Sequence, residues 1–318
     1  MALLAPLAPM ASLALGIDLG GTKTEALLLD GDGSERWRLR IPTPQAQGYE
    51  AIVDNSAGLV QQARAAAAGA AMSVGIGIPG SLGDGGLVKN ANTHCLNRRP
   101  LQADLQAALG QPVAMANDAN CLALSEATDG AGQGAGVVFA VILGTGTGAG
   151  LVVNGQVLQG PNRLAGEWGH NPMPWPLADE PAQACYCGQV GCIETVLSGP
   201  AISEAHHRRH GRRLSAQQIA AAAEAGNPVC AQTIARWQTQ LARALASVIN
   251  LLDPQVIVLG GGLSRIGSSY AVLPTLWQQW VFCGGEKEPV RTRLLPAMHG
   301  DASGVRGAAW VGRRTLPH

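Results

Sequence analysis

Short apolar runs separated by glycine and polar residues occupy the first third of the chain. The runs at 13–18, 25–29 and 36–41 are typical of strands, and the turn residues Asp30-Gly31-Asp32-Gly33 indicate a hairpin. Beyond them the pattern predicts a helix at 49–70, a strand at 74–78, a helix at 101–109 and a strand at 113–116. A strand meander followed by alternating helices and strands is typical of an α/β domain.

The same order of elements begins again near residue 136. Strands at 136–143 and 149–153 flank the glycine turn 144–148, and Asn154-Gly155 favours a hairpin leading to 156–159. We therefore expect two similar halves that hold a ligand between them. The remaining segments are predicted as an irregular Pro-, Gly- and Cys-rich insertion at 161–195, helices over 200–250 with an amphipathic run at 231–252, a strand at 256–259 and a last helix at 304–311.

The composition fits a folded protein without a broad charge field. Of 318 residues, 47% are apolar, and 22 Lys and Arg balance 22 Asp and Glu. A basic surface for nucleic acid is therefore not expected, and 4% aromatic residues argue against a stacking platform for single strands. The 42 glycines indicate tight turns and places where the backbone approaches a ligand.

Export and membrane signals are not expected from the pattern. The first fifteen residues are apolar, but they contain two prolines, no basic residue, and too few positions for a membrane span. The seven cysteines are spaced unevenly, with three at positions 185–192, which is unlike a disulfide framework. We therefore expect a cytoplasmic protein in a reducing compartment, with one metal site.

Two glycine loops are candidates for phosphate binding. Asp18 ends the first strand and precedes Gly20-Gly21-Thr22-Lys23-Thr24, and Gly144-Thr145-Gly146 stands at the matching place in the second half. Glycine backbone N–H groups can approach phosphate oxygens, and a carboxylate at a strand end can hold Mg²⁺ through water. Each loop alone could be an ordinary glycine hairpin, but the pair favours one nucleotide held from two sides. Gly260-Gly261-Gly262 is either a third approach point, near the adenosine, or a plain strand-to-helix turn.

Asn117 and Asp118 directly follow a predicted strand, at the sheet edge where α/β folds bind ligands. Transfer of a phosphoryl group to a sugar hydroxyl needs a base that accepts the hydroxyl proton, and Asp118 is the candidate. An N-cap of the next helix is an equally good interpretation of this aspartate.

A metal site is predicted by three cysteines in a C-x-C-x₄-C pattern. Cys185, Cys187 and Cys192 stand among glycines, and His170 lies fifteen residues upstream of the first. Three thiolates and one imidazole make a closed tetrahedral set, which is typical of structural zinc. A cluster of buried free thiols is the alternative.

These motifs together resemble the ROK family of repressors, open reading frames and sugar kinases. The similarity runs from Gly16 to the last helix, and Cys185–Glu194 matches the family's zinc signature CxCGxxGCxE. Within the family, the chain is most similar to bacterial fructokinases of the manno(fructo)kinase type. The supporting stretches are 16–25, 88–92, 117–121, 167–172 and 299–301, whereas Thr93-His94-Cys95 and Arg98-Arg99 depart from the fructokinase pattern.

The resemblance implies an actin-like ATPase fold, with an N-terminal lobe over 1–118 to which the helix 303–318 returns. A larger lobe over 119–302 would carry the zinc loop 166–194. It also implies ATP and Mg²⁺ as co-substrates, Asp118 as the base, and a hexose acceptor. The residues that match the sugar ligands of the family are Gly80, Asn92, Asn117, Asp118, Glu167, His170 and Glu194.

The predicted activity is ATP-dependent phosphorylation of the 6-hydroxyl of a hexose, with D-fructose as the first candidate. An N-acetylglucosamine or N-acetylmannosamine kinase and a glucokinase are the alternatives, and a silent sugar sensor is a rival from another class. The segment before the first strand is too short for the helix-turn-helix of the family's repressors. A homodimer is expected from the family, and loss of zinc is expected to weaken sugar binding while sparing ATP binding.

Overall fold

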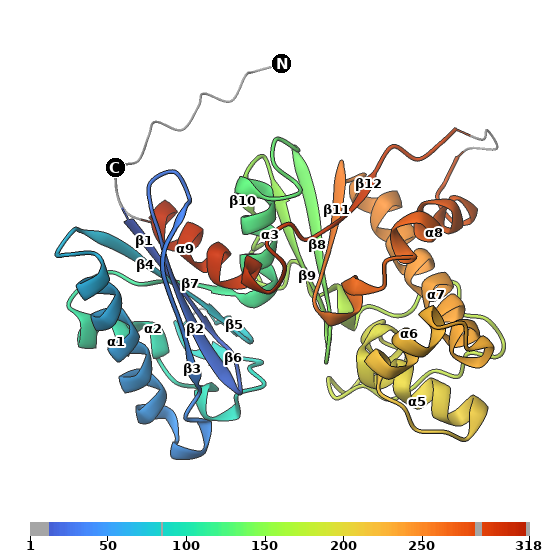
Figure 1. Cartoon of the computed structure of the whole chain (residues 1–318), viewed down its shortest axis with the longest axis horizontal. Coiled ribbons are helices and arrows are strands. Elements are labelled where there is room, and N and C mark those ends of the chain that lie inside the picture. The colour runs from blue at the N-terminus through green and yellow to red at the C-terminus, as the bar shows by residue number, and fades with distance from the viewer. Residues whose placement is uncertain (1–12, 84, 284–287, 316–318) are drawn as a thin grey trace. The chain divides into compact units, whose positions relative to one another are not determined.

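The computed structural model describes residues 13–83, 85–283 and 288–315 (Figure 1). The expectation for the N-terminal apolar segment therefore falls largely outside the described residues. The chain forms two compact units, Met1–Ser125 with Ala302–His318, and Glu126–Asp301. The first division falls inside helix α3 (Asp118–Asp129), whereas the sequence predicted a boundary at its first residue.

The first unit is built on a five-stranded sheet in the order β3-β2-β1-β4-β7. β1 (Leu13–Leu19) pairs antiparallel with β2 (Lys23–Leu29) and parallel with β4 (Met72–Ile78). β3 (Glu35–Pro42) and β7 (Ala114–Asn117) form the edges. A separate two-stranded sheet joins β5 (Ser81–Leu82) to β6 (Val88–Lys89).

Helices cover both faces of this sheet. Alternate residues of β1, such as Leu15 and Ile17, are buried with the apolar sides of α1 (Tyr49–Ala66) and α2 (Leu101–Leu109). The opposite face packs on α9 (Ser303–Thr315). A Cβ on Gly16 would lie 2.0 Å from the carbonyl oxygen of Val305, so only glycine permits this close approach.

The second unit repeats the strand order of the first. Its sheet runs β10-β9-β8-β11-β12, with an antiparallel meander of β8 (Val137–Leu143), β9 (Thr147–Val153) and β10 (Gln156–Val157). β11 (Val256–Gly260) and β12 (Arg293–Pro296) then add in parallel. In both units a meander is therefore followed by two parallel strands, which confirms the predicted similarity of the two halves.

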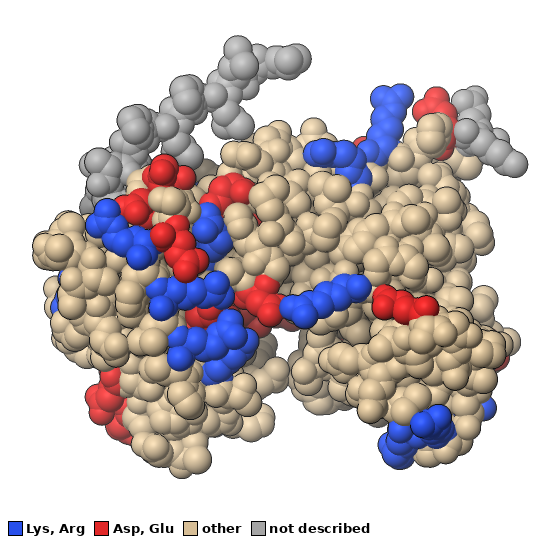
Figure 2. Space-filling view, viewed as in Figure 1, with Lys and Arg blue, Asp and Glu red and all other residues tan. Residues whose placement is uncertain are grey.

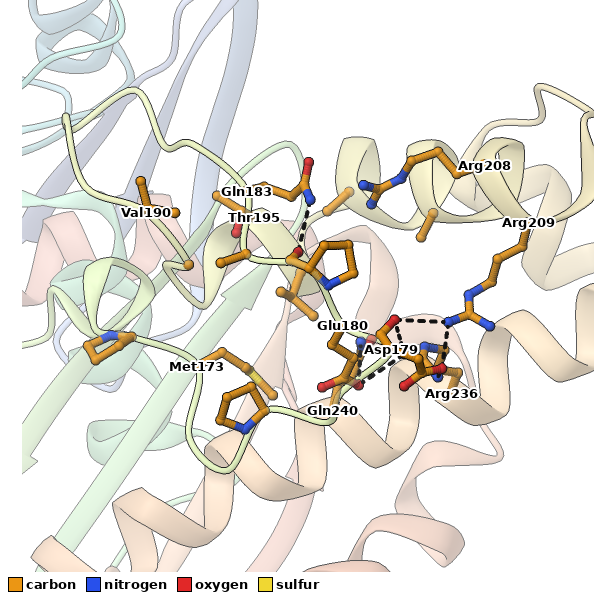
Figure 3. A pocket seen from close by; sticks show the side chains of 18 residues that line it. Met173, Asp179, Glu180, Gln183, Val190, Thr195, Arg208, Arg209, Arg236 and Gln240 are labelled. Carbon is orange, nitrogen blue, oxygen red and sulfur yellow. Dashed lines mark hydrogen bonds and ion pairs between the residues drawn. The ribbon is translucent and has the colours of Figure 1, made fainter.

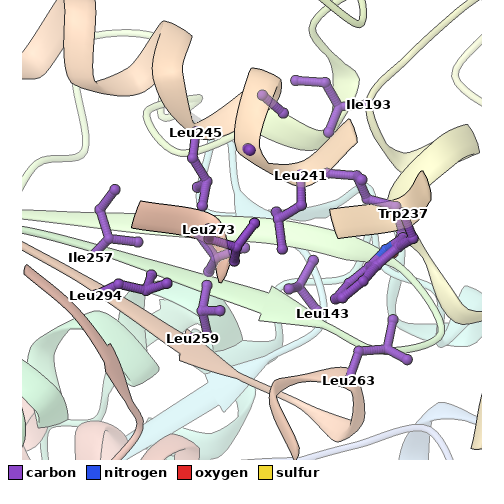
Figure 4. Close-up of a cluster of buried hydrophobic side chains, with 14 of the residues drawn as sticks. Leu143, Ile193, Trp237, Leu241, Leu245, Ile257, Leu259, Leu263, Leu273 and Leu294 are labelled. Atoms are coloured by element: carbon purple, nitrogen blue, oxygen red, sulfur yellow. The ribbon is translucent and has the colours of Figure 1, made fainter. Parts of the chain in front are cut away.

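One long helix organises the core of the second unit. α7 (Pro228–Leu252) begins after Asn227, whose side chain accepts hydrogen bonds from two backbone N–H groups of the first turn. Its apolar side buries Trp237, Leu241 and Leu245 against the sheet residues Leu143 and Leu259 (Figure 4). Among the described residues, the other α-helices that lie wholly in this unit are α4 (Glu194–Leu197), α5 (Gly199–His210), α6 (Ala216–Glu224) and α8 (Ser269–Leu276).

Some elements carry weak sequence signals. β12 is short and ends in Pro296, and α8 contains Pro274, so neither shows a long periodic pattern. Among the described residues, no helix has both the length and the apolarity needed to span a membrane. On the face drawn in Figure 2, basic and acidic side chains are interspersed rather than gathered by sign.

Candidate functional site

The first glycine loop is a tight turn between β1 and β2. The N–H of Gly20 donates to the carbonyl of Lys23 at 3.0 Å. The Thr43 hydroxyl donates to the carbonyl of Gly20 at 2.7 Å and lies 2.8 Å from the hydroxyl of Thr24. Thr24 is fully buried, so in this structure its hydroxyl supports the loop through Thr43. Thr22 and Lys23 are exposed and are free to face a ligand.

Asp18 lies beside this loop at the end of β1. Burial raises its pKa to about 6, and the neighbouring carboxylates of Asp118 and Glu25 contribute in the same direction. A Cβ on Gly304 would lie 3.3 Å from Oδ2 of Asp18, so α9 begins directly against the carboxylate. A buried carboxylate that resists ionisation and lies near other carboxylates favours a cation, and oxygen ligands of this kind suit Mg²⁺.

Asn117 and Asp118 stand where β7 gives way to α3. The Asn117 side chain accepts from the N–H of Ala119 at 2.9 Å and donates to the carbonyl of Gly80 at 3.1 Å. Asp118 Oδ1 accepts from the N–H of Ala119 at 2.8 Å. The structure therefore brings three predicted sugar residues, Gly80, Asn117 and Asp118, together in one unit. Asn117 Oδ1 accepts from the N–H groups of Ala119 and Asn120, so Asn117 caps α3 and the N-cap interpretation of Asp118 is wrong, because Asp118 is the first residue of the helix itself. The role of Asp118 as a base stays a prediction.

Asn92 lies in a turn that is held by side-chain hydrogen bonds of Asn97. The side chain of Asn97 accepts from the N–H of Ala91 and donates to its carbonyl, both at 2.9 Å. This clamp holds the turn in which Asn92 is exposed and Thr93 is buried. Sequence reasoning did not single out Asn97 or Thr43, since neither belongs to a motif whose chemistry can be read from spacing.

The second glycine loop joins β8 to β9 in the other unit. Its Gly144 N–H donates to the carbonyl of Gly146 at 3.0 Å, and the carbonyl of Gly144 accepts from Gly199 at 2.8 Å. Gly261 has a φ of +81° and packs on the carbonyl of Leu143, 2.5 Å from where its Cβ would be. The predicted residues Gly144, Thr145, Gly146, Gly260, Gly261 and Gly262 thus gather at one end of this sheet.

The predicted metal ligands converge in the same unit. The ligand atoms of His170, Cys185, Cys187 and Cys192 all lie within 4.8 Å of one another. Sγ of Cys185 is 3.6 Å from Nδ1 of His170, and the sulfurs of Cys187 and Cys192 are also 3.6 Å apart. A tetrahedral zinc site with Zn–S bonds of about 2.3 Å has edges of about 3.8 Å, so the four side chains fit zinc.

The surroundings of the thiols also suit a metal. A hydrogen bond from the Gln189 backbone lowers the pKa of Cys187 to about 7, whereas burial raises that of Cys192 to about 12. A cation is therefore needed for all three thiols to be ionised together. Nε2 of His170 faces away from the sulfurs and lies 3.1 Å from the hydroxyl of Tyr186. Tyr186, between the first two cysteines, was missed although its position in the motif could have indicated it.

The two predicted sugar carboxylates of this unit differ in their contacts. Glu167 is exposed and begins a short 3₁₀ turn that runs to His170. Glu194 begins α4, and its Oε2 accepts from the N–H of Thr147 at 2.9 Å. The resemblance assigns Glu194 to the sugar alone. In the structure, its carboxylate bonds the backbone at the end of the second glycine loop.

Ion pairs hold the metal-bearing insertion to the helices. Asp179 accepts from Arg209 at 3.0 Å and from Arg236 at 2.8 Å (Figure 3). These hydrogen bonds lower its pKa to about 2. Glu180 pairs with the fully buried Arg243 of α7. The three arginines come from α5 and α7 and the two carboxylates from the insertion, so these pairs fix the loop against both helices.

A pocket of about 400 Å³ adjoins these ion pairs, between the insertion and α5 and α7. The described residues that line it include none of those predicted to bind sugar, nucleotide or metal. Apolar side chains such as Met173 and Val196 form much of its wall. It is therefore a separate feature of the second unit and not the predicted catalytic site.

Comparison with known proteins places the chain among sugar kinases. The model of the ROK family matches residues 14–315. An N-acetyl-D-glucosamine kinase of Pectobacterium atrosepticum is 38% identical over 309 residues, which covers 92% of this chain and 97% of that protein. Among solved structures, a ROK hexokinase from Thermus thermophilus has a TM-score of 0.82 at 30% identity and covers 95% of this chain and 98% of its own.

A second solved structure is informative about ligands. A ROK family glucokinase from Streptomyces griseus, in complex with glucose and AMPPNP, has a TM-score of 0.77 at 27% identity. The similarity covers 95% of this chain and all of that chain. Together with the paired sheets, these structures identify the fold as that of the actin-like ATPases.

Proposed function

Since the chain belongs to the ROK family, we propose that this sugar kinase transfers the γ-phosphoryl group of ATP to the 6-hydroxyl of N-acetyl-D-glucosamine. The curated relatives support this acceptor, because N-acetyl-D-glucosamine kinases match more than nine-tenths of the chain at 37–38% identity. This acceptor replaces D-fructose as the first candidate.

The observation that carries the proposal is the cluster around Asp118. Its carboxylate stands at the carboxyl end of β7, close enough to Asp18 to add to the effect of burial, which raises the pKa of that side chain to about 6. Asn117, which bonds Gly80, holds the turn from which Asp118 projects. Asp118 accepts the proton of the sugar 6-hydroxyl as the new P–O bond forms.

The two glycine loops are assigned to the phosphates of ATP. Backbone N–H groups and the exposed hydroxyls of Thr22 and Thr145 donate to phosphate oxygens and stabilise the charge on the transferring group. Asp18 is the residue that would hold Mg²⁺, which when bound neutralises phosphate charge. The adenosine is assigned to the turn at 260–262.

The sugar is assigned to Gly80, Asn92, Asn117, Asp118, Glu167, His170 and Glu194. Nδ1 of His170 faces the cysteine sulfurs, so Zn²⁺ held there would orient the ring. A sugar hydroxyl would then take the place that the Tyr186 hydroxyl holds beside Nε2, at 3.1 Å. D-Fructose is the second candidate acceptor, because residues 88–92 and 167–172 resemble the fructokinases of the family.

A coupled assay of ADP release over a panel of sugars tests the proposal. N-acetyl-D-glucosamine should give the highest kcat/KM, and a higher value for D-fructose would transfer the assignment to the second candidate. Asp118→Asn should keep sugar binding and lose roughly 10²–10⁴ in kcat, the usual contribution of one positioned proton acceptor. Turnover by that variant at the wild-type rate would remove Asp118 from the mechanism.

A further inference from the structure

Thr147, the first residue of β9 directly after the second glycine loop, is held by the metal-bearing insertion on two sides. Its N–H donates to Oε2 of Glu194 at 2.9 Å. Its carbonyl lies against Gly169, where a Cβ would be only 1.9 Å from the oxygen. Gly169 immediately precedes the ligand His170, and Glu194 follows the ligand Cys192 by two positions.

The contact leaves little freedom for the loop. A Cβ on Gly146 would lie 2.7 Å from Oε2 of Glu194, so the carboxylate fills the space beside that glycine. At the other end, the carbonyl of Gly144 accepts from the N–H of Gly199, five positions beyond Glu194. Both ends of the loop are thus bonded to the segment that follows the last metal ligand.

Next to the loop, the insertion also runs along β9. The N–H of Ala149 donates to the carbonyl of Gly166 at 3.2 Å, and a Cβ on Gly166 would lie 2.2 Å from the carbonyl oxygen of Ala149. Order in the turn 166–170 is therefore transmitted directly to the start of β9. Because His170 ends that turn, the metal ligands and the phosphate loop share one connected set of contacts.

We propose that Glu194 is a positioning residue for nucleotide binding, and that Zn²⁺ bound by the Cys/His set acts through it to order the second glycine loop. This inference rests on the proposed function, and it differs from the expectation that metal loss would spare ATP. An ordered loop binds phosphate without first losing conformational freedom, so metal and nucleotide reinforce each other before any sugar is bound.

Glu167 supplies a matched control. It is the other predicted sugar carboxylate of the same insertion, but it is exposed, and no hydrogen bond from its side chain to the glycine loop is found among the described residues. Removing Glu167 should therefore change sugar binding only. Removing Glu194 should change sugar and nucleotide binding together.

The experiment is calorimetric titration of AMPPNP with Mg²⁺ in the absence of sugar. Glu194→Ala should raise the Kd about tenfold, since a charge-assisted hydrogen bond to the loop is lost. Glu194→Gln should recover part of the affinity because its amide oxygen can accept the same N–H, and Glu167→Ala should match the wild type. Glu194→Ala with wild-type affinity would overturn the proposal.

Metal depletion provides a measurement on the unmodified chain. Wild-type protein dialysed against a chelator and returned to Mg²⁺ should bind AMPPNP several-fold more weakly, and added Zn²⁺ should restore the affinity. An affinity that does not respond to zinc contradicts the inference even if Glu194→Ala fails to fold. Absence of AMPPNP binding by zinc-loaded wild type would instead refute the proposed function itself.

Discussion

The ionised carboxylate of Asp18 should lower the free energy of unfolding of this protein at neutral pH. The change Asp18→Asn keeps the size and shape of the side chain and removes its charge. In the folded chain burial raises the Asp18 pKa to about 6, and repulsion from Asp118 and Glu25 adds to this effect, against a value of about 3.9 in the unfolded chain. The folded state therefore binds this proton more tightly than the unfolded state does.

The sign and size follow from that difference. Well below the unfolded pKa of about 3.9 both states are protonated, and Asp18 has no effect on the free energy of unfolding. As the pH rises through 6 the folded state must ionise a disfavoured carboxylate, and the loss grows to about 3 kcal/mol at 1.36 kcal/mol for each pKa unit. At pH 5 the same expression leaves about 1.5 kcal/mol. The Asp18→Asn variant loses no stability in this way at pH 5 or above, because its amide does not ionise.

The assay is thermal or urea unfolding from pH 5 to 8 without divalent metal. Asp18→Asn should be more stable than wild type, by on the order of 1–3 kcal/mol at pH 8 and roughly half of that at pH 5, while kinase activity falls. Asp54→Asn, on the exposed side of α1, is the control and should change neither quantity. Equal stability of Asp18→Asn and wild type at pH 8 would refute the argument from desolvation.

Three further changes test other parts of the site. Thr145→Val should raise the ATP KM more than the sugar KM, because it removes a phosphate donor, and steady-state kinetics would show the reverse if the loop served the sugar. Glu180→Ala leaves buried Arg243 without its carboxylate and should lower the free energy of unfolding, measured in urea, by about 3–5 kcal/mol. The control Glu204→Ala breaks exposed ion pairs and should lower it by less than about 1 kcal/mol. Cys187→Ser should abolish stoichiometric zinc in metal analysis while far-UV circular dichroism stays close to wild type, and retained zinc would remove this cysteine from the ligand set.

Much of the architecture could be predicted because it depends on local pattern. The apolar runs that became β1, β2 and β8 alternate with glycine turns whose chemistry is readable within a few residues. The second occurrence of that pattern predicted two similar halves, and the sheets have the same strand order. The cysteine spacing likewise predicted a ligand set whose atoms converge in the structure.

Contacts between distant segments could not be predicted in the same way. Thr43 supports the first glycine loop from a position 23 residues away, and Glu194 bonds Thr147 across 47 residues. Neither residue type implies its partner, since a glutamate carboxylate can accept from any nearby N–H, and a threonine hydroxyl can also donate to any nearby carbonyl. The partner is chosen only when strands and turns bring two segments together.

The sequence by itself therefore indicated which residues are candidates for phosphate and metal chemistry, because side-chain type and short spacing limit that chemistry, and the family resemblance supplied the candidates for the sugar. The tertiary structure decided how those residues depend on one another. It placed Asp18 beside Asp118, where burial raises its pKa, and it placed Glu194 on the second glycine loop. Both results arise from packing over long sequence separations, where burial and hydrogen-bond geometry are set by the whole fold rather than by neighbouring residues.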